Sequence, residues 1–174
     1  RRQRQMCIRD RYPAVWSNYS ADEKAAIGLT WEDEVAAHDN RFYWGRDVDG
    51  ELIPRSITDI NEVDEDDKPI LDTDGNQLVT KGLKTLAIET AKTQAASLLA
   101  PYDWYVIRNS EKSTAIPSEI TTYRDAVRTA CANIETAINA VKTHAKFMAL
   151  YDVPVDSDGN PTGNAPINDW PDAL

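Results

Sequence analysis

Two stretches of the chain repeat apolar residues with the period of a helix. From residue 83 to 99, leucines and alanines recur at spacings of three and four and form one apolar stripe, which Pro101 ends. A longer pattern begins near Pro117 and Ser118. Its apolar residues recur every seven positions, with others between them: Ile120, Val127, Ile134, Val141 and Met148, then Cys131, Ile138 and Ala145. The spacing predicts a long helix that continues to Met148.

The seven-residue repeat predicts a seam against which another helix packs. The nearest candidate is the helix at 83–99, and pairing with it would form an antiparallel helical hairpin within the chain. The alternative is a coiled coil between copies of the protein, that is, a homo-oligomer through residues 120–148. Between the two helices, Asp103 is predicted to be the N-cap of a short helix that carries Trp104, Ile107 and Arg108.

Residues 46–82 have the shorter period of β-strands. The sequences FYWGRDVDGELIPRS and KPILDTDGNQLVTKG each place apolar or β-branched residues on both sides of an Asp-Gly turn, which predicts two β-hairpins. The segment NEVDEDDKP between them is expected to be a solvated acidic connector.

The two ends of the chain have weaker patterns. Ser20 is the predicted N-cap of a short helix over residues 21–27, which Gly28 ends, and Thr30 is expected to begin a further helical turn. Five aromatic residues are expected to pack into a small cluster: Trp16, Trp31, Phe42, Tyr43 and Trp44. The tail is rich in proline, glycine and aspartate, so we expect it to be extended except where Ile167 and Trp170 find a surface.

Together these patterns predict an α+β fold that is mainly α. A C-terminal helical hairpin with a long helix follows short β-hairpins and an aromatic N-terminal region, and an extended tail ends the chain. The expected segments are a basic extension at 1–11, the aromatic region at 12–45, the hairpins at 46–82, the helical domain at 83–150 and the tail at 151–174.

The chain is strongly acidic, with a formal net charge of -10 in 174 residues. Binding to phosphate backbones and anionic lipids depends on cationic side chains, so we predict neither a nucleic-acid partner nor a membrane partner. No apolar run approaches the roughly 20 residues needed to cross a bilayer. The two cysteines, Cys7 and Cys131, are far apart in the sequence, which indicates neither a disulfide framework nor a zinc knuckle.

The first eleven residues, RRQRQMCIRDR, differ from the rest because they hold five arginines and one acid. Three interpretations compete: a basic arm for an anionic partner, a solvated tail, or a segment that is no part of the gene product. We prefer the third, because QMCIRDR resembles translated sequencing-adapter read-through at the ends of metagenomic open reading frames. On this interpretation the natural N-terminus is missing.

Acidic turns and two histidines are the remaining candidates for chemistry. Three segments share the pattern D-x-D-G, at 47–50, 72–75 and 156–159. A calcium loop of the EF-hand type needs a further acid and a later glutamate that are not in register, so we interpret the three segments as turns. His38 and His144 lack companion ligands and are expected at the surface. We therefore predict no enzyme, no cofactor and no metal site.

The stretch from Leu98 to Arg128 combines aromatic residues, arginines and acids between the helical patterns. Large aromatic side chains and fork-shaped arginines suit a recognition surface, although an arginine there would equally brace the bend of the hairpin. Arg108 and Glu111 are spaced to pair across one turn. The candidate partner-binding residues are Trp104, Tyr105, Arg108, Glu111, Tyr123, Arg124 and Arg128.

This stretch resembles the phage tail assembly chaperone domain of tail fibre assembly proteins from tailed bacteriophages. The family pattern runs D-W-x-x-x-R-x-x-E, a proline, then Y-R-x-x-x-R. It matches here at Asp103, Trp104, Arg108, Glu111, Pro117, Tyr123, Arg124 and Arg128, and a later W-P matches at Trp170 and Pro171. The chain departs from the family's commoner form because the long seven-residue repeat separates the motif from that W-P.

The resemblance implies a small accessory protein that binds a tail fibre or tail protein and helps it to assemble in the cytoplasm of the infected bacterium. The alternative is a small structural subunit that remains in the tail of the virion. The departure from the family pattern leaves both functions open.

Overall fold

The computed structural model describes residues 16–29 and 37–174, which belong to two compact units, 1–37 and 38–174. The first unit contains the 3-10 helix η1 (Trp16–Asn18) and helix α2 (Ala21–Ala26). The predicted N-cap is confirmed, because the Ser20 hydroxyl accepts from the Glu23 N–H while the Glu23 carboxylate accepts from the Ser20 N–H. The turn predicted at Thr30 lies outside the described residues.

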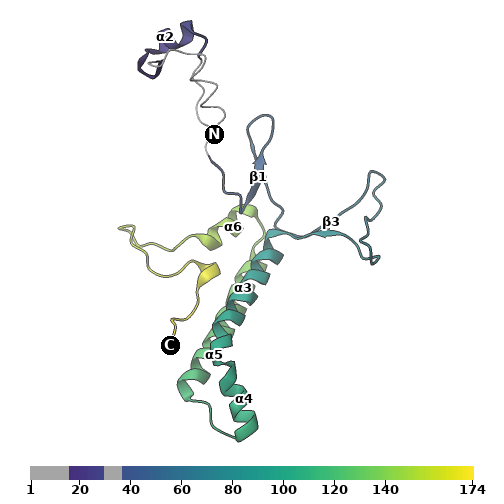
Figure 1. Cartoon of the computed structure of the whole chain (residues 1–174), viewed down its shortest axis with the longest axis vertical. Coiled ribbons are helices and arrows are strands. Elements are labelled where there is room, and N and C mark those ends of the chain that lie inside the picture. The colour runs from purple at the N-terminus through teal and green to yellow at the C-terminus, as the bar shows by residue number, and fades with distance from the viewer. Residues whose placement is uncertain (1–15, 30–36) are drawn as a thin grey trace. The chain divides into compact units, whose positions relative to one another are not determined.

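In the second unit, α3 (Leu83–Leu99) and α5 (Ser118–Ala140) lie side by side and run antiparallel (Figure 1). Three alanines on α3 face the apolar seam of α5, so the two backbones approach closely. The Lys84 ammonium donates to the carbonyl oxygen of Val141 at 2.5 Å and so joins the start of α3 to the end of α5. The predicted helical hairpin is confirmed. Within the chain, α3 covers the seam of α5, and a homo-oligomer through residues 120–148 stays a prediction.

The long helix ends earlier than the seven-residue repeat predicts. Val141 is extended, at φ -65° and ψ 138°, and Thr143 caps a separate helix, α6 (His144–Met148), by accepting from the Lys146 N–H. The 3-10 helix η3 (Ala149–Tyr151) follows. The break changes which residues face the core: Ala145, on the predicted seam, is exposed, whereas Phe147, off the seam, is 1% exposed.

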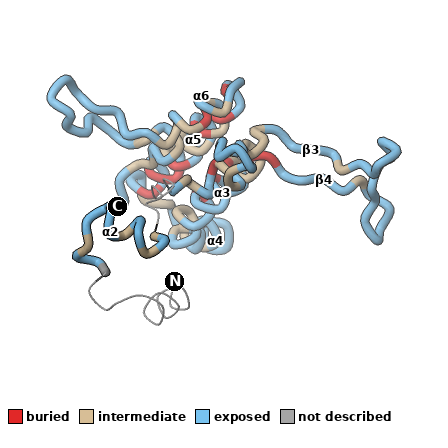
Figure 2. The backbone as a smooth tube through the Cα atoms, turned by 90° about the horizontal axis from the view of Figure 1, so that it is seen from above, coloured by how far each residue is buried: buried red, intermediate tan, exposed pale blue. Residues whose placement is uncertain are grey.

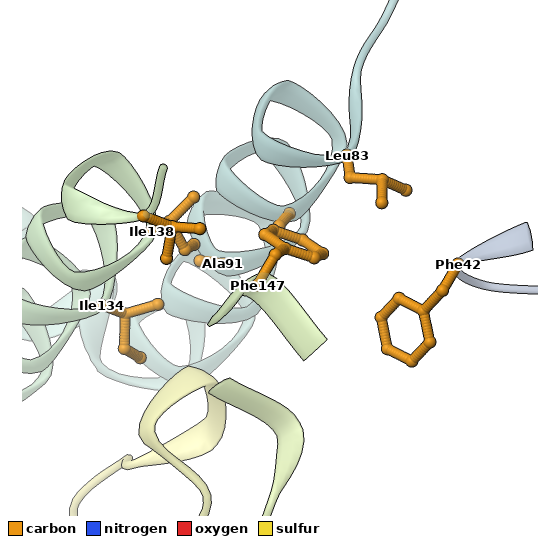
Figure 3. Close-up of a cluster of buried hydrophobic side chains, with 8 residues drawn as sticks. Phe42, Leu83, Ala91, Ile134, Ile138 and Phe147 are labelled. Carbon is orange, nitrogen blue, oxygen red and sulfur yellow. The ribbon is translucent and has the colours of Figure 1, made fainter. Parts of the chain in front are cut away.

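The main core joins the hairpin to the segments on either side of it. Phe42 comes from before α3 and Phe147 from after α5, and their rings meet edge to face at 6.2 Å (Figure 3). The same cluster includes Leu83 and Ala91 of α3 and Ile134 and Ile138 of α5. In Figure 2 the buried residues gather on α3, α5 and α6.

Two sequence-based expectations fail at this core. His144 is half-buried rather than at the surface, because its Nε2 lies 2.9 Å from the carbonyl oxygen of Phe42 and its ring packs against Tyr43. The predicted aromatic cluster does not form as one group. Phe42 and Tyr43 pack towards α6 and η3, whereas Trp44 is 62% exposed and lies under the Arg55 guanidinium at 4.5 Å. Trp31 and the side chain of Trp16 lie outside the described part of the chain.

Two small antiparallel sheets precede α3, so the predicted α+β, mainly α fold is confirmed. Strands β1 (Tyr43–Arg46) and β2 (Leu52–Pro54) form the first predicted hairpin. Strands β3 (Ile60–Asn61) and β4 (Val79–Thr80) pair as a stem from which two loops branch. We call residues 60–80 the forked hairpin.

The branch point of the forked hairpin is closed by a ring of backbone hydrogen bonds. Glu62 N–H donates to Leu78, Leu78 N–H to Ile70, and Ile70 N–H to Glu62, all at 2.8 to 3.0 Å. The Gln77 side-chain amide donates to the Glu62 carbonyl at 2.6 Å and so fills the branch point. The segment predicted as a solvated connector is therefore one of the two arms, because Val63 pairs with Pro69 across it.

Among the described residues, the same five-residue loop occurs four times. In each, the first aspartate accepts from the backbone N–H groups two and four residues later at 2.8 to 3.0 Å. The fourth residue has positive φ and is glycine in three loops and Asp67 in the other. The turn interpretation of the D-x-D-G segments is thus confirmed. The loops are 47–51, 64–68, 72–76 and 156–160.

The forked hairpin is mounted on the start of α3. The Asp59 carboxylate accepts from the Gly82 N–H at 2.8 Å and from the Thr85 hydroxyl at 2.6 Å, which caps the helix from outside. Gly82 packs so closely on the backbone of Thr58 and Asp59 that no side chain fits there. Both hydrogen bonds lower the pKa of Asp59 below its ordinary value, the Thr85 bond having the larger effect.

The C-terminal tail returns to the helical hairpin. It forms a loop closed by pairing of Val155 with Pro161, then the 3-10 helix η4 (Pro166–Asn168). Ile167 and Trp170 pack on the core, as predicted. Among helices of the described residues, none has the length and apolarity needed to span a membrane.

We expect Gly82→Ala to destabilise the second unit by about 1–3 kcal/mol, because the new methyl group would overlap the backbone of Thr58. Urea unfolding measures the change. Gly163→Ala is the matched control, since the added methyl group would meet only Pro154 Cγ at 3.7 Å. Equal unfolding midpoints for the two variants would contradict the close packing.

Asp59 should make the stability of the attachment between the forked hairpin and the start of α3 sensitive to acid. Its folded-state pKa is lowered, so its contribution to stability is complete above the ordinary aspartate pKa of about 4 and is lost as the pH falls through the folded value. Asp59→Asn should therefore flatten the decline of the unfolding midpoint between about pH 5 and pH 2. An unchanged pH profile in this variant would show that the two hydrogen bonds do not discriminate between the ionised and neutral acid.

Candidate partner-binding surface

The candidate surface lies at the bend between α3 and α5. After α3, the 3-10 helix η2 (Ala100–Tyr102) leads directly into α4 (Asp103–Lys112). Ser113 ends α4 in the left-handed conformation, at φ 51°, and the Asn109 side-chain amide closes the next loop by donating to the Thr114 carbonyl at 2.9 Å. Pro117 then precedes α5 as its N-cap residue.

Arg124 braces this bend from inside. It is 8% exposed, and its Nη1 donates to the Leu99 carbonyl at 3.2 Å and to the Asp103 carboxylate at 2.8 Å. One guanidinium therefore ties α5 to the last turn of α3 and to the first turn of α4. Asp103 is not the N-cap as predicted. Tyr102 occupies that position, and Asp103 is the first helical residue, where it pairs with Arg124.

Tyr123 belongs to the same internal brace. It is 6% exposed, and its ring meets that of Tyr102 edge to face at 5.3 Å. Burial raises the pKa of its hydroxyl. Because Tyr123 and Arg124 are both buried, neither is presented to a partner, and their predicted place on the binding surface is corrected to the interior of the hairpin.

Trp104, Tyr105 and Arg108 form a stack on α4. The two rings lie 3.9 Å apart between centroids, and the Arg108 guanidinium carbon is 4.7 Å from the Trp104 ring and 5.2 Å from the Tyr105 ring. The stack is at the surface, with Trp104 48% exposed. Ile107, one turn from Trp104, is 58% exposed and extends the same face.

The helix that carries the stack has no buried residue along its ten residues. Ten residues are too few for an isolated helix to be stable in water, so α4 is held by its connections at both ends, including the Asp103–Arg124 pair. Ile107 was not among the partner-binding residues predicted from the sequence. Its spacing of three from Trp104, which puts both side chains on one helix face, was the signal that could have identified it.

The remaining two candidates lie apart from the stack. Glu111 is exposed, and the predicted pairing with Arg108 is not formed in the described structure. Arg128 pairs instead with Asp125 at 2.9 Å. It lines a surface hollow with Cys131, whose thiol pKa is raised by burial and then by its hydrogen bond to Glu135.

The W-P pair docks on the side of the hairpin. The indole N–H of Trp170 donates to the Gln94 side-chain oxygen on α3 at 3.2 Å, and its ring packs against both core clusters. Pro171 is half-buried beside it. Within the described ranges, no group of three or more histidine, cysteine or acidic side chains is arranged to hold a metal ion.

Arg124→Ala should destabilise the second unit by about 1–3 kcal/mol, because the part-buried Leu99 carbonyl loses its donor and Asp103 loses its partner. The matched control is Arg128→Ala, which removes an exposed pair on the same helix and should change stability by less than about 0.5 kcal/mol. Thermal unfolding followed by circular dichroism measures both. Equal midpoints would assign no bracing role to Arg124.

Comparisons of the chain with protein-family models, curated proteins and solved structures found no match. What the D-W and Y-R motifs imply about function therefore rests on this chain's own residues and their geometry.

Proposed function

We propose that this protein is a non-enzymatic assembly factor of tailed-phage tails, whose helix α4 binds a segment of a tail fibre or tail protein. One observation carries the proposal: no residue of α4 is buried, although two of them, Trp104 and Ile107, are large and apolar. Exposed large apolar side chains grouped on one helix face are typical of protein interfaces.

The motif residues divide into two groups that support this proposal. Asp103, Tyr123 and Arg124 brace the bend, whereas Trp104, Tyr105 and Arg108 lie on its outer side. Buried anchors keep exposed residues in a fixed arrangement, and rigid aromatic residues with a nearby arginine are the types that dominate binding energy at interfaces.

The expected client segment follows from the chemistry of the stack. Its apolar side chains would cover Trp104 and Ile107, and a carboxylate or carbonyl oxygen would accept from Arg108. Among the described residues, Arg108 has no ion-pair partner. Its Nε is buried, so the two terminal nitrogens of the guanidinium are the donors that would reach the client.

Trp104→Ala should weaken binding of the full chain to a tail-fibre C-terminal fragment from the same genome by about thirtyfold, as expected for a central aromatic anchor. Isothermal titration measures the affinity. Trp44→Ala is the matched control, because Trp44 is also exposed under an arginine but belongs to β1. Equal weakening by both substitutions, or by neither, contradicts the role of α4.

The alternative, a structural subunit of the tail, predicts a different fate for the protein. A transient assembly factor should be absent from purified phage particles, whereas a subunit should be present in fixed ratio to the tail proteins. Quantitative mass spectrometry of the particles distinguishes them, and a fixed ratio would overturn the chaperone proposal while leaving α4 as an interface.

A further inference from the structure

The forked hairpin exposes an unusual group of apolar side chains. Six large apolar residues between positions 60 and 80 have exposed fractions of 38 to 56%: Ile60, Val63, Ile70, Leu71, Leu78 and Val79. Every residue of the forked hairpin is exposed except Glu62 and Gln77, which are half-buried at the branch point. Figure 2 shows the same contrast between β3–β4 and the buried helices.

Both faces of the stem carry these residues. The register pairs Ile60 with Thr80 and Asn61 with Val79, and the Glu62 N–H donates to Leu78 one step further on. Opposed residues share a face and neighbours alternate, so Ile60 and Leu78 lie on one face and Val79 on the other. Two-stranded hairpins without a covering layer are marginal in water, so this one depends on its turns, its branch point and any partner that covers it.

The charge of the forked hairpin restricts what can cover it. Residues 60–80 contain seven acids and one lysine, and four of the acids lie in the loop 64–68. This charge repels nucleic acids, anionic lipids and a second copy of the same segment, whereas it attracts lysine and arginine side chains.

The forked hairpin is also held in place and is separate from α4. Asp59 and Gly82 fix it to the first turn of α3, while α4 follows the last turn of the same helix. Seventeen residues of helix separate these attachment points by about 25 Å. Binding at one end therefore leaves the other end free.

We propose that the forked hairpin is a second docking surface, which binds a protein segment that combines apolar side chains with lysine or arginine. The apolar residues of that segment cover the stem and arms, and its cations face the acids of the loops. With α4 at the other end of α3, the protein can bridge two partners. This inference does not depend on the identity of the α4 client.

The test uses the full chain and a fluorescein-labelled twelve-residue peptide of alternating valine and lysine. Binding is followed by fluorescence anisotropy, and backbone amide shifts of the protein locate the site. We expect shifts confined to residues 60–80, and an affinity about tenfold lower for the double variant Leu71→Ser/Leu78→Ser. Its thermal midpoint should be unchanged because both side chains are exposed.

Two controls make the test decisive. The double variant Val153→Ser/Val155→Ser removes equally exposed apolar residues beside another acidic loop and should bind the peptide normally. A peptide of alternating valine and glutamate should not bind. Absence of binding by the lysine peptide, shifts outside residues 60–80, or equal binding of both peptides would overturn the proposal.

Discussion

The close antiparallel contact between α3 and α5 is the interaction on which the second unit depends. The small side chains of Ala87, Ala91 and Ala95 leave room for the branched side chains of α5. Val127 and Ile138 are wholly buried there. Burial of each such side chain contributes about 1.5–3 kcal/mol. Larger residues on α3 would separate the helices and would disturb the attachment points at both of its ends.

The C-terminal end of α3 leads into the bend, where hydrogen bonds rather than apolar packing hold the helices together. The Leu99 carbonyl ends α3 and needs a donor from outside the helix, and no residue of α4 is fully buried. Arg124 serves both, because one guanidinium donates to Leu99 and to Asp103. The exposed stack of Trp104, Tyr105 and Arg108 can therefore remain uncovered without loss of the fold.

The second end is the joint between α3 and the forked hairpin, where the constraint is steric and electrostatic. Gly82 permits close contact with Thr58, and Asp59 caps the helix. In both places, a local brace that is independent of any partner holds an uncovered apolar element. Surfaces held in this way are preorganised, and preorganised surfaces lose less conformational entropy on binding.

The sequence by itself determined the elements whose signals are local. Helical period predicted α3 and most of α5, Ser20 predicted the start of α2, and each D-x-D-G segment predicted a turn, because these depend on residues within a few positions of one another. The sequence also identified the residues of the bend. It did not separate those that brace the bend from those that are exposed, because residue type alone does not determine exposure.

Only the tertiary structure decided where long-range packing outweighs local pattern. The heptad runs through Val141, yet the backbone is extended there, and the turn lets Phe147 pack against Phe42 in the core. His144 and Tyr43 are drawn inward by the same contact. The branch in the forked hairpin depends on backbone hydrogen bonds among Glu62, Ile70 and Leu78, and backbone groups leave no trace in the sequence.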